Sequence, residues 1–303
     1  MAASLVLLAA WSVLSGPSKD TGSVDRSASF WHMVVPGLVV AIAMLVGIWF
    51  SKAGGWSIPP AQSTDWFAAA LELSLVAVIA AGILRTQTLG LATRVLMALV
   101  LCSGLAWKQA RSSWPLGESI ATIGSFTLLT VLAWSALDRL CAPRHGTLGT
   151  TDASHRLHGA PAWSGPAVLL CWTGLASQAL AATDSILLGK VLAMLAAVMG
   201  VALVLSLVRR TSDFMSGVPA VVSLLMCVLV YSGLHYAGLR VWMAVLIGIA
   251  PAFATGVDLL LLRSLTGTPR GLARVGAVSL LPAIVLAVAI PAALKAAEGS
   301  EGY

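Results

Sequence analysis

Long, nearly unbroken apolar runs alternate with short polar gaps along the chain. A bilayer core about 30 Å thick is crossed by roughly 20 apolar helical residues. None of the runs alternates apolar and polar residues as a barrel strand would. The pattern predicts an all-α fold, a polytopic helical transmembrane bundle with no soluble domain. Nine runs have about the required length: residues 31–50, 66–84, 88–107, 119–136, 163–181, 185–208, 218–235, 239–262 and 272–294.

The first 15 residues form a shorter apolar run. A secretory signal peptide starts with a basic region, yet no Lys or Arg precedes Lys19. Because the positive charge follows this run, we interpret residues 1–15 as a short first helix with Met1 outside. An interfacial helix is the alternative, since the run is shorter than most spans. The prediction is about ten transmembrane helices, or nine without this segment, in one integral membrane domain over residues 1–303.

Composition supports the same class. Apolar residues make up 58% of the chain and charged residues only 10%, whereas a soluble domain has about a quarter charged residues. This composition excludes a soluble enzyme, a disordered chain and a nucleic-acid-binding domain. The expected surroundings are therefore the lipid bilayer, with membrane-protein subunits as candidate partners and no nucleic acid.

The positive charge of the loops sets an orientation. Lys and Arg number 18 against 12 for Asp and Glu. In the predicted topology, 11 basic residues lie on one side of the membrane and 5 on the other. The side with more positive charge should be cytoplasmic, which makes residues 137–162 the longest cytoplasmic loop. Both termini are then expected outside a cell membrane, the inner membrane in a bacterium.

Apart from Arg240 and Arg274, which lie at span ends and are counted with the loops, four charged residues fall within the predicted spans. An ionisable group in such a place is a candidate functional site. By depth they form two pairs of opposite charge, Glu72 with Lys190 and Asp258 with Arg94. The last three lie close enough to a span end for the charged group to reach water. Glu72 lies deeper, so it is the best candidate for moving a proton or cation, with a structural hydrogen bond between helices as the alternative.

A proline interrupts the run at 239–262. Pro251 lies in the middle of IGIAPAFATG, seven residues before Asp258. Proline lacks a backbone N–H, so a kink with a freed carbonyl is expected there. Transporters build binding sites from interrupted helices of this kind, which makes the Pro251–Asp258 segment a second candidate site.

Motifs for catalysis or metal binding are missing from the sequence. It contains no phosphate-binding loop, no HExxH and no GxSxG. The loop 137–162 holds His145, His155 and His158, but their spacing matches no zinc pattern. We therefore predict no catalytic, cofactor-binding or metal-binding residues, and enzymatic activity is disfavoured. The cysteines are widely spaced, form no CxxC pair and are expected to be small buried side chains: Cys102, Cys141, Cys171 and Cys227.

Two functions fit these features. The first is a small-solute or ion permease that uses Glu72 and the helix break at Pro251–Asp258. The alternative is a non-catalytic membrane subunit or scaffold of a larger membrane complex. An intramembrane enzyme acting on lipids is less favoured, because the polar residues do not cluster in the sequence.

Overall fold

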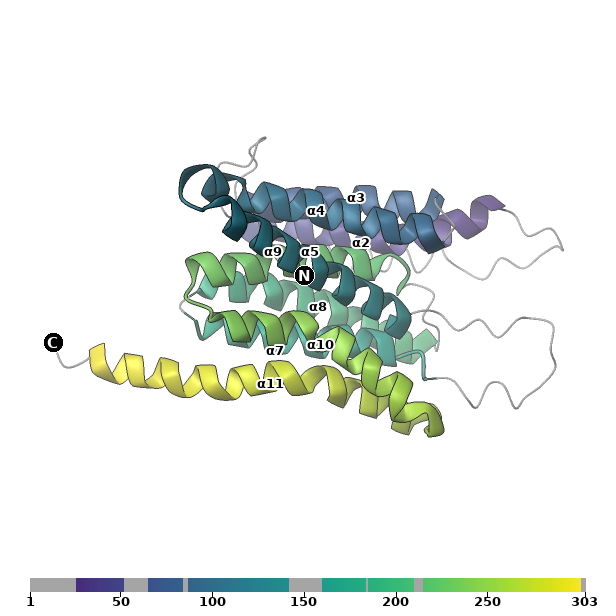
Figure 1. Ribbon diagram of the computed structural model, residues 1–303. Helices are drawn as coiled ribbons and strands as arrows, with labels where there is room; N and C mark the ends of the chain where they lie inside the picture. The colour runs from purple at the N-terminus through teal and green to yellow at the C-terminus, as the bar shows by residue number, and fades with distance from the viewer. Residues whose placement is uncertain are drawn as a thin grey trace. The chain divides into compact units, whose positions relative to one another are not determined.

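The computed structural model describes residues 26–51, 65–83, 87–141, 160–183, 185–209 and 215–300. Within these ranges all secondary structure is helical, comprising nine α-helices and one 3-10 helix (Figure 1). The predicted first helix at residues 1–15 lies outside the described residues. In chain order the elements are α2 (Arg26–Ser51), α3 (Trp66–Ile83), α4 (Gln87–Ser112), α5 (Leu116–Cys141), α7 (Ser164–Ala181), α8 (Ile186–Arg209), α9 (Val218–Tyr236), α10 (Val241–Leu260), η2 (Leu262–Ser264) and α11 (Gly267–Ser300).

The helices confirm an all-α, multi-pass membrane protein. Six of them contain stretches long and apolar enough to cross a bilayer, and two contain shorter apolar stretches. Each of the nine predicted runs coincides with a helix. The helix at 163–181, α7, is not among the six or the two, because polar residues interrupt its apolar sequence. The six long stretches are Leu89–Trp107, Leu116–Cys141, Ile186–Arg209, Val218–Tyr236, Val241–Leu260 and Gly267–Leu294, and the shorter ones are Val34–Trp49 and Trp66–Ala80.

The helices divide into two compact units. Unit 1 comprises Met1–Trp134 and Asp213–Val228, and unit 2 comprises Ser135–Ser212 and Leu229–Tyr303. In unit 1, α3 packs against α2 and α4. In unit 2, α7 packs against α8 and α11, and α10 packs against α11. Because the unit boundaries fall inside α5 and α9, each of these helices contributes residues to both units.

Large apolar side chains remain exposed along several of the apolar helices. In a bilayer, such side chains are in contact with lipid tails at little cost. Trp49 and Trp107 are exposed near helix ends, as expected for residues at the membrane interface. Trp134 of α5, by contrast, is buried. Exposed apolar residues include Leu96 on α4, Leu128 on α5, Val204 and Leu207 on α8, and Leu272 and Leu280 on α11.

Glycine allows close packing of α7 and α8. The Ser177 hydroxyl of α7 donates a hydrogen bond to the Gly189 carbonyl of α8, at 2.8 Å. A Cβ at Gly189 would lie 2.8 Å from the Ala181 Cβ and 3.1 Å from the Ser177 carbonyl oxygen. The absence of a side chain at this position therefore determines how closely the two helices approach.

Substitution of this glycine is expected to destabilise the protein. Overpacking a close contact costs about 1–3 kcal/mol, while replacing a helical glycine with alanine gains about 0.5–1 kcal/mol. Gly189→Ala should therefore lower the free energy of unfolding by about 1 kcal/mol, measured by steric trapping in bicelles. Gly200→Ala on the same helix is the matched control, because its Cβ would meet only Leu170 Cδ1 at 4.0 Å. The interpretation fails if both variants change stability equally.

Candidate functional site

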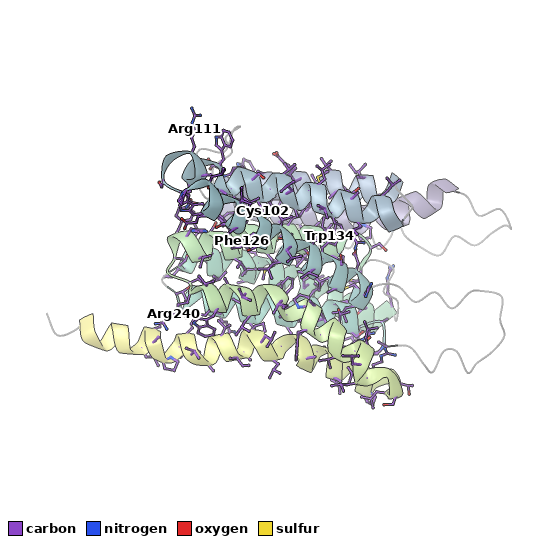
Figure 2. The ribbon with its side chains drawn as sticks, in the orientation of Figure 1. Cys102, Arg111, Phe126, Trp134 and Arg240 are labelled. Atoms are coloured by element: carbon purple, nitrogen blue, oxygen red, sulfur yellow. The ribbon has the colours of Figure 1, made fainter. Side chains whose placement is uncertain are left out.

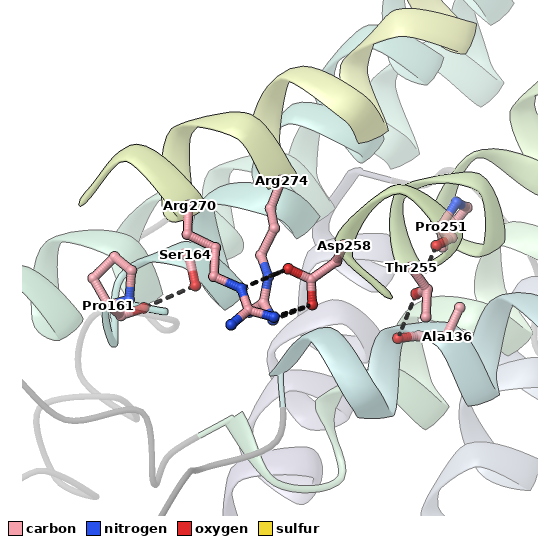
Figure 3. A network of polar contacts seen from close by, with 8 residues as sticks. All are labelled: Ala136, Pro161, Ser164, Pro251, Thr255, Asp258, Arg270 and Arg274. Atoms are coloured by element: carbon pink, nitrogen blue, oxygen red, sulfur yellow. Dashed lines mark hydrogen bonds and ion pairs between the residues drawn. The ribbon is translucent and has the colours of Figure 1, made fainter. Parts of the chain in front are cut away.

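An ion cluster joins the end of α10 to the start of α11 in unit 2. Asp258 of α10 accepts hydrogen bonds from Arg270 and Arg274 of α11 (Figure 3). Arg270 Nε is 2.8 Å from Oδ1 and its Nη2 is 3.1 Å from Oδ2. Arg274 Nε is 2.8 Å from Oδ1 and its Nη2 is 2.5 Å from Oδ2. Each guanidinium thus binds both carboxylate oxygens, the arrangement with the best-defined geometry for this pair of groups.

The local sequence explains why the three residues meet. Arg270 and Arg274 are four residues apart, so both lie on one face of α11. The chain between the helices is short, with η2 followed by Gly267 at a φ of 64°. Only glycine adopts this backbone conformation without strain. The turn therefore reverses the chain within a few residues and brings that face of α11 opposite Asp258.

The cluster is almost wholly removed from solvent. The side chain of Asp258 is 7% exposed, that of Arg270 11% and that of Arg274 3%. Burying a charge is costly unless it is paired and hydrogen-bonded. Because the pairing is complete on the carboxylate side, the cluster fixes the position of α11 relative to α10.

Other contacts hold the same region. The Thr255 hydroxyl is 3.0 Å from the Pro251 carbonyl oxygen and 3.3 Å from that of Ala136 in α5 (Figure 3). A Cβ added at Gly271 of α11 would lie 2.7 Å from the Pro161 ring, just before α7. The start of α11 therefore lies close to the start of α7 as well as to the end of α10.

The helix break at Pro251 has a specific hydrogen-bond partner. Proline cannot donate to the carbonyl four residues before it, which here belongs to Ile247. The indole Nε1 of Trp172 in α7 donates to this carbonyl at 2.9 Å, and Trp172 is buried. The freed carbonyl predicted from the sequence is thus occupied by a side chain of the protein. This contact makes the break part of the packing between α7 and α10.

The partner expected for Asp258 requires a correction. Depth in the predicted spans suggested Arg94, but the carboxylate is bound by Arg270 and Arg274. The guanidinium carbon of Arg94 lies 5.9 Å from the centre of the Trp134 ring, which Figure 2 labels. Arg94 thus makes a cation–π contact with a tryptophan of its own unit, unit 1. Snorkelling is also excluded for Asp258, because its residue is 5% exposed.

Lys190 and Glu72 differ in their surroundings. Lys190 is exposed near the start of α8, as expected for a side chain reaching the interface. Glu72 is half-buried in α3, with apolar residues on both sides in the sequence. Among the described residues, the carboxyl of Glu72 has no hydrogen-bond and no ion-pair partner. Because the two residues belong to different units, their pairing stays a prediction.

The part of the chain that the structure describes contains no group of three or more His, Cys, Asp or Glu side chains able to hold a metal ion. Of the polar residues in the loop 137–162, His145, His155 and His158 lie outside the described residues. Cys102, Cys141 and Cys227 are buried, as predicted, and Cys171 is partly exposed.

Arg270 and Arg274 are two of the 11 basic residues counted on the cytoplasmic side from the sequence, and no partner was predicted for either. The spacing RGLAR at the start of an apolar run was the signal for a basic helix face. An acidic residue near the end of the preceding run should then have been paired with it, because two helices joined by a short connection lie side by side.

Comparison with protein-family models, with curated proteins and with solved structures gave no significant match.

Proposed function

We propose that the protein is a permease that moves protons, or a small solute or ion together with protons, and that Glu72 is the group that binds the proton. The observation that carries this proposal is the environment of Glu72. Its carboxyl lies seven residues into the 18-residue apolar helix α3 and has no ion-pair partner among the described residues.

The chemistry of this position supports the proposal. An ionised carboxylate inside a bilayer is unfavourable without a partner. A carboxyl that gains and loses a proton within the membrane can couple proton movement to transport. The paired Asp258 lacks this freedom, because neutralising it would leave two buried guanidinium groups without their counter-ion.

The Pro251–Asp258 segment takes a different part in this proposal. The Ile247 carbonyl that Pro251 leaves free and the carboxylate of Asp258 are both bonded to protein groups. We assign the segment to a rigid frame within unit 2, against which other parts of the permease move. The proposed topology has ten spans with both termini outside, and this places the ion cluster at the cytoplasmic end of α10.

A liposome assay tests the proposal. Purified protein is reconstituted with an entrapped pH-sensitive dye, and a potassium diffusion potential drives protons inward. The assay is run first without any added solute and then with panels of amino acids, sugars, organic acids and inorganic cations. We expect flux above protein-free liposomes in at least one condition, and Glu72→Gln should abolish it, because glutamine cannot carry the proton.

The matched control is Glu118→Gln, which removes an exposed carboxylate at the first turn of α5. This variant should retain the wild-type flux. The same flux in Glu72→Gln and in the wild type would refute the role of Glu72, and no flux in any condition would refute the permease.

A non-catalytic membrane subunit or scaffold is the second candidate. It is favoured by unit 2, in which the ion cluster and the Trp172–Ile247 hydrogen bond hold three helices in fixed positions. The exposed apolar faces of α4, α8 and α11 offer contact area for other membrane helices. A wild-type protein without flux that purifies from mild detergent with a constant stoichiometric partner would support this function.

A further inference from the structure

Two of the buried cysteines, Cys102 and Cys227, form a pair in unit 1. Cys102 of α4 and Cys227 of α9 are buried, and their Sγ atoms are 3.5 Å apart. A disulfide bond is about 2.05 Å long, so these are two separate thiols in contact. Figure 2 labels Cys102 among the side chains of the helices. The two sulfurs thus come from helices that are distant in the sequence, α4 and α9, and lie in contact.

Threonine hydroxyls of α5 adjoin this pair, and a serine of α9 lies one helical turn from Cys227. Thr127 and Thr130 of α5 adjoin Cys102, and Ser223 lies one helical turn before Cys227 on the same face of α9. The Oγ1 of Thr127 and the Oγ of Ser223 are buried and have no hydrogen-bond partner among the described residues. Buried hydroxyls without partners are costly and are uncommon in folded proteins. The two groups are therefore donors available to any charge that forms at the sulfurs.

We propose that Cys102 and Cys227 bind one soft monovalent metal ion, of the Cu(I) class. Thiolates select this class of ion over hard cations. On binding, each thiol releases its proton to water and the ion takes two thiolate ligands, with no change in any oxidation state. The resulting complex has one negative charge. Hydrogen bonds from Thr127 and Ser223 to the thiolates would stabilise this charge, which gives both hydroxyls a role.

The ligand set distinguishes this class of ion from others. Structural Zn²⁺ needs four ligands, and the described residues hold no group of three or more suitable side chains. Cu(I) is stable with two thiolates. Two metal–thiolate bonds of about 2.3 Å hold the sulfurs at most about 4.6 Å apart. The Sγ–Sγ distance of 3.5 Å must therefore increase by at most about 1 Å, which side-chain rotation supplies. A disulfide would satisfy the sulfurs but would leave both hydroxyls without partners.

Competition with a Cu(I) chelator tests the site. The purified protein in detergent is titrated anaerobically against the Cu(I)–bathocuproine disulfonate complex, and loss of its absorbance reports transfer of Cu(I). The wild type should remove about one equivalent of Cu(I). Cys102→Ser and Cys227→Ser should each weaken binding by about ten-fold or more, and Thr127→Val by about ten-fold, since groups bonded to metal ligands have effects of this size.

Cys141→Ser and Cys171→Ser are the matched controls and should bind Cu(I) as the wild type does. Equal loss of Cu(I) binding in all four cysteine variants, or no loss in Cys102→Ser and Cys227→Ser, overturns the site.

X-ray absorption of the Cu(I)-loaded wild type tests the ligands directly, without any substitution. Two sulfur ligands on copper support the proposal, and a shell of nitrogen or oxygen ligands overturns it. Neither measurement depends on transport, so the site and the permease are tested separately.

Discussion

Replacing Asp258 with asparagine is expected to lower the free energy of unfolding by about 3–5 kcal/mol, because breaking a buried ion pair leaves uncompensated charge. Arg270 and Arg274 would both lose their counter-ion while their residues stay 9% and 3% exposed. The measurement is steric trapping of the protein in bicelles, supported by thermal unfolding in detergent. Among single substitutions by an uncharged residue in unit 2, this is the largest loss of stability that we expect.

A combined variant separates the charge from the packing. Asp258→Leu with Arg270→Met and Arg274→Met removes all three charges and keeps most of the volume. Such replacements of buried ion clusters are often neutral or stabilising, so much of the lost stability should return. Should the triple variant prove less stable than Asp258→Asn, charge pairing would not be the reason for the cluster.

The second large effect concerns the helix break. Trp172→Phe removes the indole N–H that bonds to the Ile247 carbonyl and leaves that carbonyl buried without a donor. An unsatisfied buried carbonyl costs about 1–3 kcal/mol, so we expect a loss of about 2 kcal/mol in the free energy of unfolding. Phenylalanine keeps one six-membered ring but lacks the five-membered part of the indole, so a cavity adds to this loss.

Pro251→Ala provides the control for this substitution. Alanine restores the backbone N–H at residue 251, which can bond to the Ile247 carbonyl within the helix. In the Pro251→Ala background, Trp172→Phe should therefore cost about 1 kcal/mol less than in the wild type. Identical costs in the two backgrounds would show that the indole hydrogen bond does not compensate for the proline.

The helices were the part of the fold most accessible from the sequence. Apolar runs have a length set by the bilayer and cannot be confused with the alternating strands of a barrel. The run at 163–181 does form a helix, α7, but Thr173, Ser177 and Gln178 reduce its apolar character. Thr173 and Ser177 are buried against protein, where their hydroxyls have hydrogen-bond partners. The sequence alone does not show which face of a helix is buried in this way.

The partners of the charged residues were harder to predict. The sequence indicates the depth of a residue along its span but not its position in the plane of the membrane. Asp258 was paired with Arg94 because both lie near the cytoplasmic ends of their predicted spans. The true neighbours of Asp258 follow from the hairpin of α10 and α11, which a depth argument ignores. The contacts of Trp172 with Ile247 and of Cys102 with Cys227 join residues 75 and 125 positions apart. Such pairs depend on helix packing and leave no local signal.

Glu72 and the ion cluster are thus assigned opposite roles in one protein. Glu72 has no charged partner among the described residues and is proposed to exchange protons. Asp258 is bound on both oxygens and is assigned to the frame. The difference follows from whether neutralising the carboxylate leaves another buried charge behind.

Comparison of two variants in the liposome proton-flux assay tests this assignment, with the free energy of unfolding measured for each. Glu72→Gln should keep the wild-type stability and lose the proton flux. The triple variant Asp258→Leu, Arg270→Met, Arg274→Met should keep the flux, since none of its three charges takes part in transport. Loss of flux in the triple variant with flux preserved in Glu72→Gln would contradict the assignment and place the transport chemistry in the cluster of α10 and α11.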